Sequence, residues 1–278
     1  MRVIAALWLR NVKLFVRNRV QLVLILIMPF FYLYLLSNIF QSTAIDNPVP
    51  YVLAGIVIIV VFQTSLNIAS STIDDIVSGY MKEVLVSPVK RIQIAVGQML
   101  SSTTIATFQG IMILIAGYFI GLKYSSVLTP LAAVGFMIVA GLVFSAFGLF
   151  LAASVKQSQT FQIVSMAVTT PITFLCGVYV PLSLLPQGLQ ILALLNPMTY
   201  AAAFFRALSL EKMSLPADDL IAEQLAFQID RFVITPQVSA VIVLTFGILF
   251  VLLSTIAFSR ADFTSINRTK GSKDIFQQ

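Results

Sequence analysis

Long stretches without a single charged side chain dominate this sequence of 278 residues and limit what it can fold into. The six charge-free intervals are 20–45, 47–73, 92–122, 124–155, 157–205 and 232–259. Each exceeds the roughly 20 apolar residues that cross a bilayer core as a helix. Hydrophobic residues make up 59% of the chain and charged residues only 10%, far from the averages of soluble domains. The sequence therefore predicts an all-α polytopic membrane protein with a single transmembrane domain over residues 1–278.

The interval 157–205 is too long for one span, and prolines at 181, 186 and 197 interrupt its second half. We expect one span at about 159–180, followed by a re-entrant hairpin and loop over residues 182–236 that dips into the outer leaflet. Irregular backbone at that depth requires cover from protein or from a water-filled cavity. Together with the other five intervals, this pattern predicts six transmembrane helices.

The basic residues predict the orientation of the chain. With six spans and a cytoplasmic N-terminus, 13 of the 17 Lys and Arg residues face the cytoplasm. A seven-span topology leaves 12 inside and 5 outside, so charge alone hardly separates the two counts. We expect a multi-pass protein of the plasma (bacterial inner) membrane with both termini cytoplasmic. The net charge of +6 is divided among short clusters without an extended basic face, which argues against a nucleic-acid partner.

Residues 1–19 have the pattern of an amphipathic helix. At 100° per residue the apolar side chains share one arc, and four basic side chains lie on the opposite arc. The apolar set is Val3, Ile4, Leu7, Trp8, Leu14 and Phe15, and the basic set is Arg2, Arg10, Lys13 and Arg17. Such a helix lies in the cytoplasmic leaflet as an interfacial anchor, with Trp8 at headgroup depth and membrane lipid as its partner. A role as a lever against a cytoplasmic partner is a compatible alternative.

Several classes of chemistry are disfavoured by what the sequence lacks. It contains no His, which excludes His-based metal sites and His-dependent triads. No ionisable residue lies deep in an expected span, which argues against an ion-coupled carrier and an intramembrane hydrolase. No phosphate-binding loop of the G-x-x-x-x-G-K-[ST] type occurs. We therefore expect no enzyme activity and no bound cofactor in this chain, and if transport is active its energy must come from another polypeptide.

A polar island at residues 79–91 separates two long apolar stretches, 47–73 and 92–122. Met81 to Ser87 can form two helical turns, with Gly79 loosening the start and Pro88 ending the helix. The pattern alone leaves two interpretations open: a short helix that contacts a partner protein and transfers force, and an ordinary solvated loop with topogenic lysines.

Two segments carry a family resemblance. The first is Lys82-Glu83-Val84-Leu85-Val86-Ser87-Pro88-Val89-Lys90-Arg91, followed by Gln93 and Gly97. The second contains Val180-Pro181-Leu182, Pro186, Leu195-Asn196-Pro197-Met198-Thr199-Tyr200 and Arg206. Both resemble signatures of type-2 ATP-binding-cassette (ABC) transporter permeases, including the membrane subunits of daunorubicin-resistance-type drug exporters. The resemblance extends over the whole chain in length, span plan and motif order.

The resemblance implies roles for particular residues. Residues 79–88 correspond to a cytoplasmic coupling helix on a separate ATPase subunit, with Glu83 at the contact. The implied ATPase-coupling residues are Lys82, Glu83, Val84, Leu85, Ser87, Pro88, Lys90 and Arg91. The residues expected to shape the outer hairpin are Pro181, Asn196, Pro197, Tyr200 and Arg206, with Arg206 anchored at the headgroups. Complexes of this family contain two permeases, either two copies or sister chains, and two cytosolic ABC ATPase subunits that bind ATP and Mg.

A polar stripe marks a candidate path for cargo. In similar exporters the second and fifth spans line a central cavity. Gln63, Asn67 and Ser71 repeat at intervals of four residues on the second span. On the fifth span Thr169, Thr170 and Phe174 lie around a kink expected at Pro171. Small polar residues in membrane helices also bond neighbouring helices or their own backbone, which is the alternative role.

These features lead to one functional hypothesis and two alternatives. The hypothesis is the membrane-spanning permease subunit of an ATP-driven ABC exporter for an amphipathic or hydrophobic cargo, such as a drug-like compound or lipid. The first alternative is a non-transporting membrane sensor or scaffold that docks on an ATPase. The second is an ion-gradient-driven carrier.

Overall fold

The computed structural model describes residues 2–40, 48–77, 91–155, 157–229 and 232–260. Its helices are α1 (Arg2–Arg17), α2 (Arg19–Phe40), α3 (Pro48–Val77), α5 (Arg91–Ile120), α6 (Leu128–Ser154), α7 (Ser158–Leu175), α8 (Gln187–Leu194), α9 (Pro197–Ser209), α10 (Ala217–Ala222) and α11 (Pro236–Arg260). A 3₁₀ turn η1 (Leu182–Leu184) precedes α8. Strands β1 (Phe227–Ile229) and β2 (Phe232–Ile234) pair antiparallel just before α11. The predicted all-α membrane fold is confirmed, with this short ribbon as its one β element in the described part.

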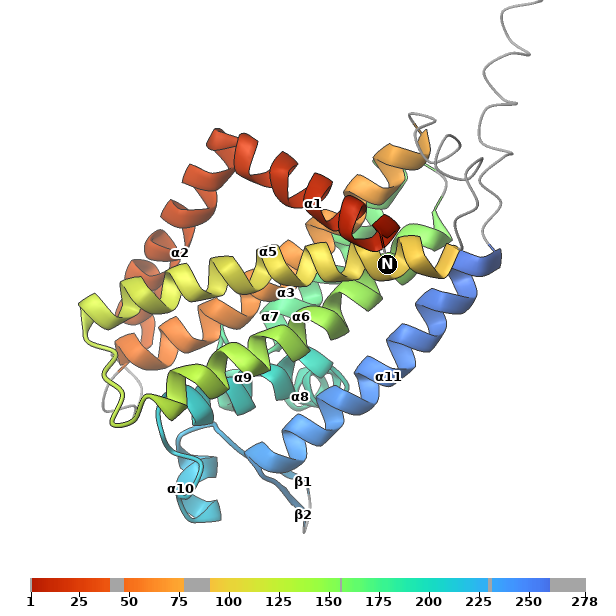
Figure 1. The fold of residues 1–278 in the computed structure, drawn as a ribbon. Helices are drawn as coiled ribbons and strands as arrows, with labels where there is room; N and C mark the ends of the chain where they lie inside the picture. Colours follow the sequence, from red (N-terminus) through yellow and green to blue (C-terminus); the bar gives the residue numbers. More distant parts are fainter. Residues whose placement is uncertain (1, 41–47, 78–90, 156, 230–231, 261–278) are drawn as a thin grey trace, which may run out of the picture.

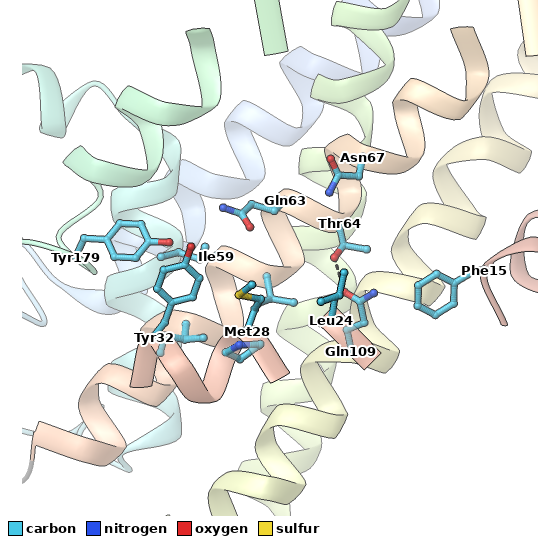
Figure 2. A pocket seen from close by; sticks show the side chains of 13 residues that line it. Phe15, Leu24, Met28, Tyr32, Ile59, Gln63, Thr64, Asn67, Gln109 and Tyr179 are labelled. Atoms are coloured by element: carbon cyan, nitrogen blue, oxygen red, sulfur yellow. Dashed lines mark hydrogen bonds between the residues drawn. The ribbon is translucent and has the colours of Figure 1, made fainter. Parts of the chain in front are cut away.

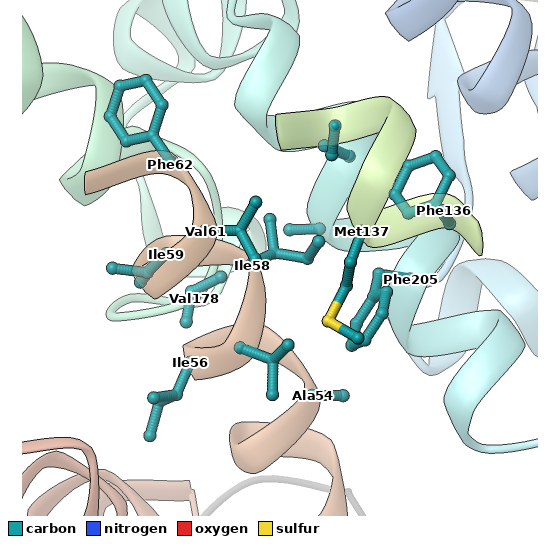
Figure 3. Packing of buried hydrophobic residues seen from close by; sticks show 14 of the residues in the cluster. Ala54, Ile56, Ile58, Ile59, Val61, Phe62, Phe136, Met137, Val178 and Phe205 are labelled. Atoms are coloured by element: carbon teal, nitrogen blue, oxygen red, sulfur yellow. The ribbon is translucent and has the colours of Figure 1, made fainter. Parts of the chain in front are cut away.

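Helix α3 forms the centre of the bundle (Figure 1). It packs against α5, α6 and α9, and its side chains from Tyr51 to Ile59 are all buried. Apolar side chains therefore surround it on several sides, as a continuous hydrophobic run requires. Figure 3 shows this packing, with Ile58 and Val61 facing Met137 of α6 and Phe205 of α9. The buried side chains of α3 therefore hold α5, α6 and α9 in place around it.

Four helical segments of the described chain are long and apolar enough to cross a bilayer. They are Pro48–Asn67, Arg91–Ile120, Leu128–Ser154 and Pro236–Ala257. Two bent pairs meet the same condition only when each is taken as one span: α1 with α2, and α8 with α9, which meet at 80°. Helix α7, expected as the fifth span, is not in this set, because glutamine, serine and threonine dilute its 18 residues. The predicted count of six spans in the predicted order thus stays a prediction.

Small residues bring α6 close to its neighbours. Ala140 and Ala146 are fully buried, and a Cβ added at Gly141 would lie 3.1 Å from Cγ2 of Thr103 on α5. Small side chains at these positions allow the two helices to approach closely. Gly135 differs, since it is exposed and a Cβ there would meet nothing within 4 Å.

The bundle has two distinct ends. We call the end with α1, the last turns of α3 and the first turns of α5 the α1 end. The opposite end, with α10, β1, β2 and the 121–127 connection, is the hairpin end (Figure 1). At the hairpin end Glu211, with a φ of 57°, turns its carboxylate toward the start of α6. Its Oε1 atom accepts hydrogen bonds from the backbone N–H of Ser125 (2.9 Å) and the hydroxyl of Thr129 (2.7 Å).

These hydrogen bonds from Ser125 and Thr129 lower the pKa of Glu211. A carboxylate whose pKa is lower in the folded state stabilises the fold above its unfolded pKa, and loses that contribution as the pH falls through the folded pKa. We therefore expect Glu211→Gln to lower the melting temperature at pH 7, and the difference from wild type to shrink as the pH falls. The measurement is a melting series in detergent from pH 7 to pH 3, with Asp218→Asn on α10 as a control carboxylate. If the melting temperatures of wild type and Glu211→Gln change in parallel with pH, the ionised Glu211 carboxylate contributes nothing to stability at this contact.

Candidate functional site

A cavity of about 310 Å³ lies between α1, α2, α3 and α5 (Figure 2). Helix α3 lines it over nearly three turns, α2 covers it, and Tyr179 from the segment after α7 closes one side. The described residues that line it are Phe15, Leu24, Met28, Pro29, Tyr32, Ile56, Ile59, Val60, Gln63, Thr64, Asn67, Gln109 and Tyr179. None of these side chains carries a charge. The cavity therefore combines hydrocarbon with amides, phenols and one hydroxyl.

The α3 contribution follows directly from helical spacing. Ile56, Val60, Gln63 and Asn67 recur at intervals of three or four residues and so share one face of α3. Gln63 and Asn67 are exposed, whereas nearly all other side chains in the same part of α3 are buried. The structure thus places both of these predicted residues in the cavity. Ser71 belongs to the same helix, but its side chain lies outside the described part.

Residues predicted on the fifth span are placed differently. Thr169, Thr170 and Phe174 lie on α7 and do not line the cavity of this chain. The carbonyls of Thr169 and Thr170 both accept hydrogen bonds from the hydroxyl of Thr173, at 2.8 and 3.0 Å. Phe174 reaches the edge of the site through its ring contact with Tyr179, whose centroid is 5.2 Å away. A cargo contact for these three residues stays a prediction.

Gln109, Tyr32 and Tyr179 line the cavity although sequence reasoning did not select them. The hydroxyl of Thr64 donates a hydrogen bond to Oε1 of Gln109, which joins α3 to α5 beside the cavity. On α5, Gln98 and Gln109 are 11 residues apart, or about three turns, and so share a face. This spacing is a signal of the same kind as the Gln63–Asn67 stripe. The rings of Tyr32 and Tyr179 contact each other at 5.8 Å, which connects α2 to the segment after α7.

Helix α1 is docked on the bundle through polar contacts. The guanidinium of Arg10 donates two hydrogen bonds to the carboxylate of Asp75 on α3, at 2.6 and 2.7 Å. The buried Asn11 amide donates to Oε1 of Gln98 (2.6 Å) and to the hydroxyl of Ser101 (2.9 Å) on α5. The indole N–H of Trp8 donates to the Thr104 hydroxyl at 3.0 Å. The amphipathic α1 is thus held by both helices that flank the polar island.

The predicted coupling residues of that island lie outside the described residues, except for Arg91. Residues 78–90 are not described, so the helix expected over 79–88 and the side chains from Lys82 to Lys90 stay predictions. Arg91 is the first residue of α5. The described structure shows where this segment is attached. The segment follows Val77, the last residue of α3 and two residues after Asp75, and it ends at Arg91, the first residue of α5.

The hairpin residues predicted from the second motif organise the turn between α8 and α9. Asn196 caps α9, because its Oδ1 accepts from the backbone N–H of Met198 (2.9 Å), and Pro197 follows as the first helical residue. The Asn196 amide also donates to the carbonyl of Ile172 on α7 at 2.7 Å. The hydroxyl of Tyr200 donates to the carbonyl of Leu194. Pro181 is buried and lies just before η1, as its N-cap residue.

Arg206 departs from the prediction that it anchors at the headgroups. It is only 2% exposed and lies inside the protein, because α9 packs its arginine-bearing face against α3. Its guanidinium donates to the hydroxyl of Tyr51 (2.9 Å) and the carbonyl of Gly177 (3.1 Å), and lies 4.0 Å from the Tyr51 ring centroid. A Cβ at Gly55 would come within 2.8 Å of this guanidinium, so glycine makes room for it. The headgroup role is therefore wrong, and Arg206 instead joins three segments of the core.

Comparison with known proteins agrees with this architecture. Residues 2–210 match the family described as ABC-2 type transporter. The chain is 24% identical over 244 residues to a putative transport permease, ycf38, of Cyanophora paradoxa, covering 85% of this chain and 82% of that one. It is 28% identical over 209 residues to the inner membrane transport permease YadH of Escherichia coli K12, covering 72% and 80%. Since the family match covers most of the chain, this multi-pass membrane protein belongs to the ABC-2 type transporter family of membrane permeases.

Proposed function

We propose that this chain is the membrane-spanning subunit of an ATP-driven exporter in a bacterial-type inner membrane, with both termini cytoplasmic. It moves an amphipathic or hydrophobic cargo, such as a drug-like compound or a lipid, out of the cytoplasm or the inner leaflet. ATP and Mg bind to two cytosolic ABC ATPase subunits, and a second copy or a sister permease completes the complex. Family membership supports an ABC ATPase partner in general, and the names of the relatives support transport.

The chemistry of the cavity is the observation that carries the cargo class. Its described lining has hydrocarbon side chains from α2 and α3 next to the amides of Gln63 and Asn67, and no charge. Moving an ion into such surroundings without a partner is strongly unfavourable, whereas an apolar or amphipathic molecule gains contacts there. The cavity volume of about 310 Å³ is within the range of small-molecule sites.

A route for the driving force follows from the contacts at the α1 end. The segment 79–88, proposed as the coupling helix, is attached to α3 and α5, and α1 joins both through Arg10–Asp75 and Asn11–Gln98. Movement of this segment by an ATPase would therefore displace the ends of both helices together. Because α3 also carries Gln63 and Asn67, its displacement would change the cavity.

Purification of the tagged chain with its ATPase partner tests the proposal. We expect the ATPase activity of the complex to rise with uncharged lipophilic compounds such as Nile red and to be insensitive to soluble glycans. Gln63→Trp should abolish this stimulation, because the indole fills the cavity beside α2. The matched control is Val241→Trp, which places the same ring on the exposed face of α11. Stimulation by glycans alone would contradict the cargo class, and the absence of any ATPase partner would contradict the transporter role.

A further inference from the structure

Gln109 brings an unused hydrogen-bond donor to the wall of the cavity. Its side chain is 2% exposed, and its Oε1 accepts the hydroxyl of Thr64. Its Nε2 group has no hydrogen-bond partner among the described residues. Figure 2 shows this nitrogen turned away from Thr64, toward the side of the cavity where Phe15 lies. A buried amide donor without a partner is unfavourable, so the position calls for an acceptor from outside the chain.

A second buried glutamine on α5, Gln98, differs from Gln109 in its position relative to the cavity. Gln98 also has an Nε2 group without a partner among the described residues, and it is 3% exposed. It lies at the contact with Asn11 of α1 and does not line the cavity. Of these two buried glutamines, Gln109 thus combines an unpaired donor with a position at the cavity wall, and Gln98 does not.

The cavity has two chemically distinct parts along α3. Ile56, Ile59 and Val60 form an apolar part, which Met28 of α2 covers. Gln63, Thr64 and Asn67 form a polar part about one to two turns further along α3, and Gln109 joins it from α5. Hydrogen-bonding groups next to hydrocarbon are the surroundings that an amphiphile requires, and the lack of charge in the described lining disfavours ionic headgroups.

We propose that the cavity selects an uncharged amphiphile whose acceptor oxygen binds the Nε2 group of Gln109. Its hydrocarbon part lies between α2 and the apolar part of α3. This inference rests on the proposed function and narrows its cargo class. Pure hydrocarbons are excluded because they lack the acceptor oxygen, and anionic lipids are excluded because the described lining does not compensate their charge. Gln109 is then a specificity-determining residue for the cargo.

Photo-cross-linking of the full chain in phosphatidylcholine nanodiscs tests this selection. Three probes carry the same diazirine-bearing chain: a diacylglycerol, the corresponding phosphatidic acid and an alkane. Adducts on the cavity-lining peptides of α2, α3 and α5 are quantified by mass spectrometry. We expect diacylglycerol to label these peptides about tenfold more than phosphatidic acid, because ion burial is unfavourable. Gln109→Met should reduce diacylglycerol labelling about three- to tenfold, the effect of one lost hydrogen bond, and leave alkane labelling unchanged.

The control is Gln237→Met, the same exchange at an exposed position of α11 outside the cavity, and it should leave labelling by all three probes unchanged. Gln109→Asn, which retains an amide but withdraws it by one methylene group, serves as a second variant if the methionine variant does not fold. Equal labelling by diacylglycerol and phosphatidic acid, or equal labelling of wild type and both Gln109 variants, would overturn the inference while the cavity remained a cargo site. Labelling of the cavity peptides no stronger than that of the exposed face of α11 would instead overturn both the inference and the cavity as a cargo site.

Discussion

Arg206→Ala is expected to remove most of the folded protein from detergent extracts. The substitution deletes a cation that donates to the Tyr51 hydroxyl and the Gly177 carbonyl and packs on the Tyr51 ring. Both acceptors are buried, and alanine cannot reach either. The loss of charge-assisted hydrogen bonds and of a desolvated cation–π contact corresponds to about 2–4 kcal/mol. This is a large part of the stability of a typical domain. The measurement is the monodisperse yield and melting temperature of the purified chain.

Two further variants separate the shape of the arginine side chain from its charge. Arg206→Lys retains the charge but not the planar fork that reaches two acceptors, and should give an intermediate melting temperature. Arg17→Ala, at an exposed position of α1, should leave yield and melting temperature unchanged. A melting temperature for Arg206→Ala within about 2 °C of wild type would show that the cluster does not stabilise the fold.

Arg206 also marks a limit of what sequence can predict. A lone arginine at the end of an apolar interval is expected at the headgroups, because that is where a charge is solvated. Its actual position depends on Tyr51, 155 residues away in sequence, and on a backbone carbonyl. Neither leaves a pattern around residue 206. The apolar intervals predicted the membrane class correctly, because they reflect a constraint that acts along the whole length of each helix.

The residues of the candidate site also differ in whether the sequence could predict them. Gln63 and Asn67 were predictable because two polar side chains four residues apart form a stripe on an apolar helix. Tyr32 and Tyr179 were not, since each is a single aromatic residue in an aromatic-rich membrane chain. Gln109 was predictable in part, through its spacing from Gln98. The cavity as a whole depends on how α2 packs beside α3, which no local pattern specifies.

Glu83→Lys is expected to abolish cargo-stimulated ATPase activity and to release the ATPase partner from the purified chain. The family resemblance places Glu83 at the contact between the coupling helix and the ATPase. The described structure adds that both ends of this segment continue into α3 and α5, which pack together and are both held by α1. A reversed charge at the contact replaces attraction with repulsion, which costs several kcal/mol at a close interface.

The matched control is Asp218→Lys, which makes the same charge change on the exposed surface of α10 at the opposite end of the bundle. It should leave stimulation by the uncharged compound Nile red and the amount of co-purified ATPase unchanged. Equal stimulation and equal ATPase recovery for the two variants would place the coupling contact elsewhere. The contacts of α1 with Asp75 and Gln98 would then be the next candidates, because α1 is the other element that joins both helices at this end.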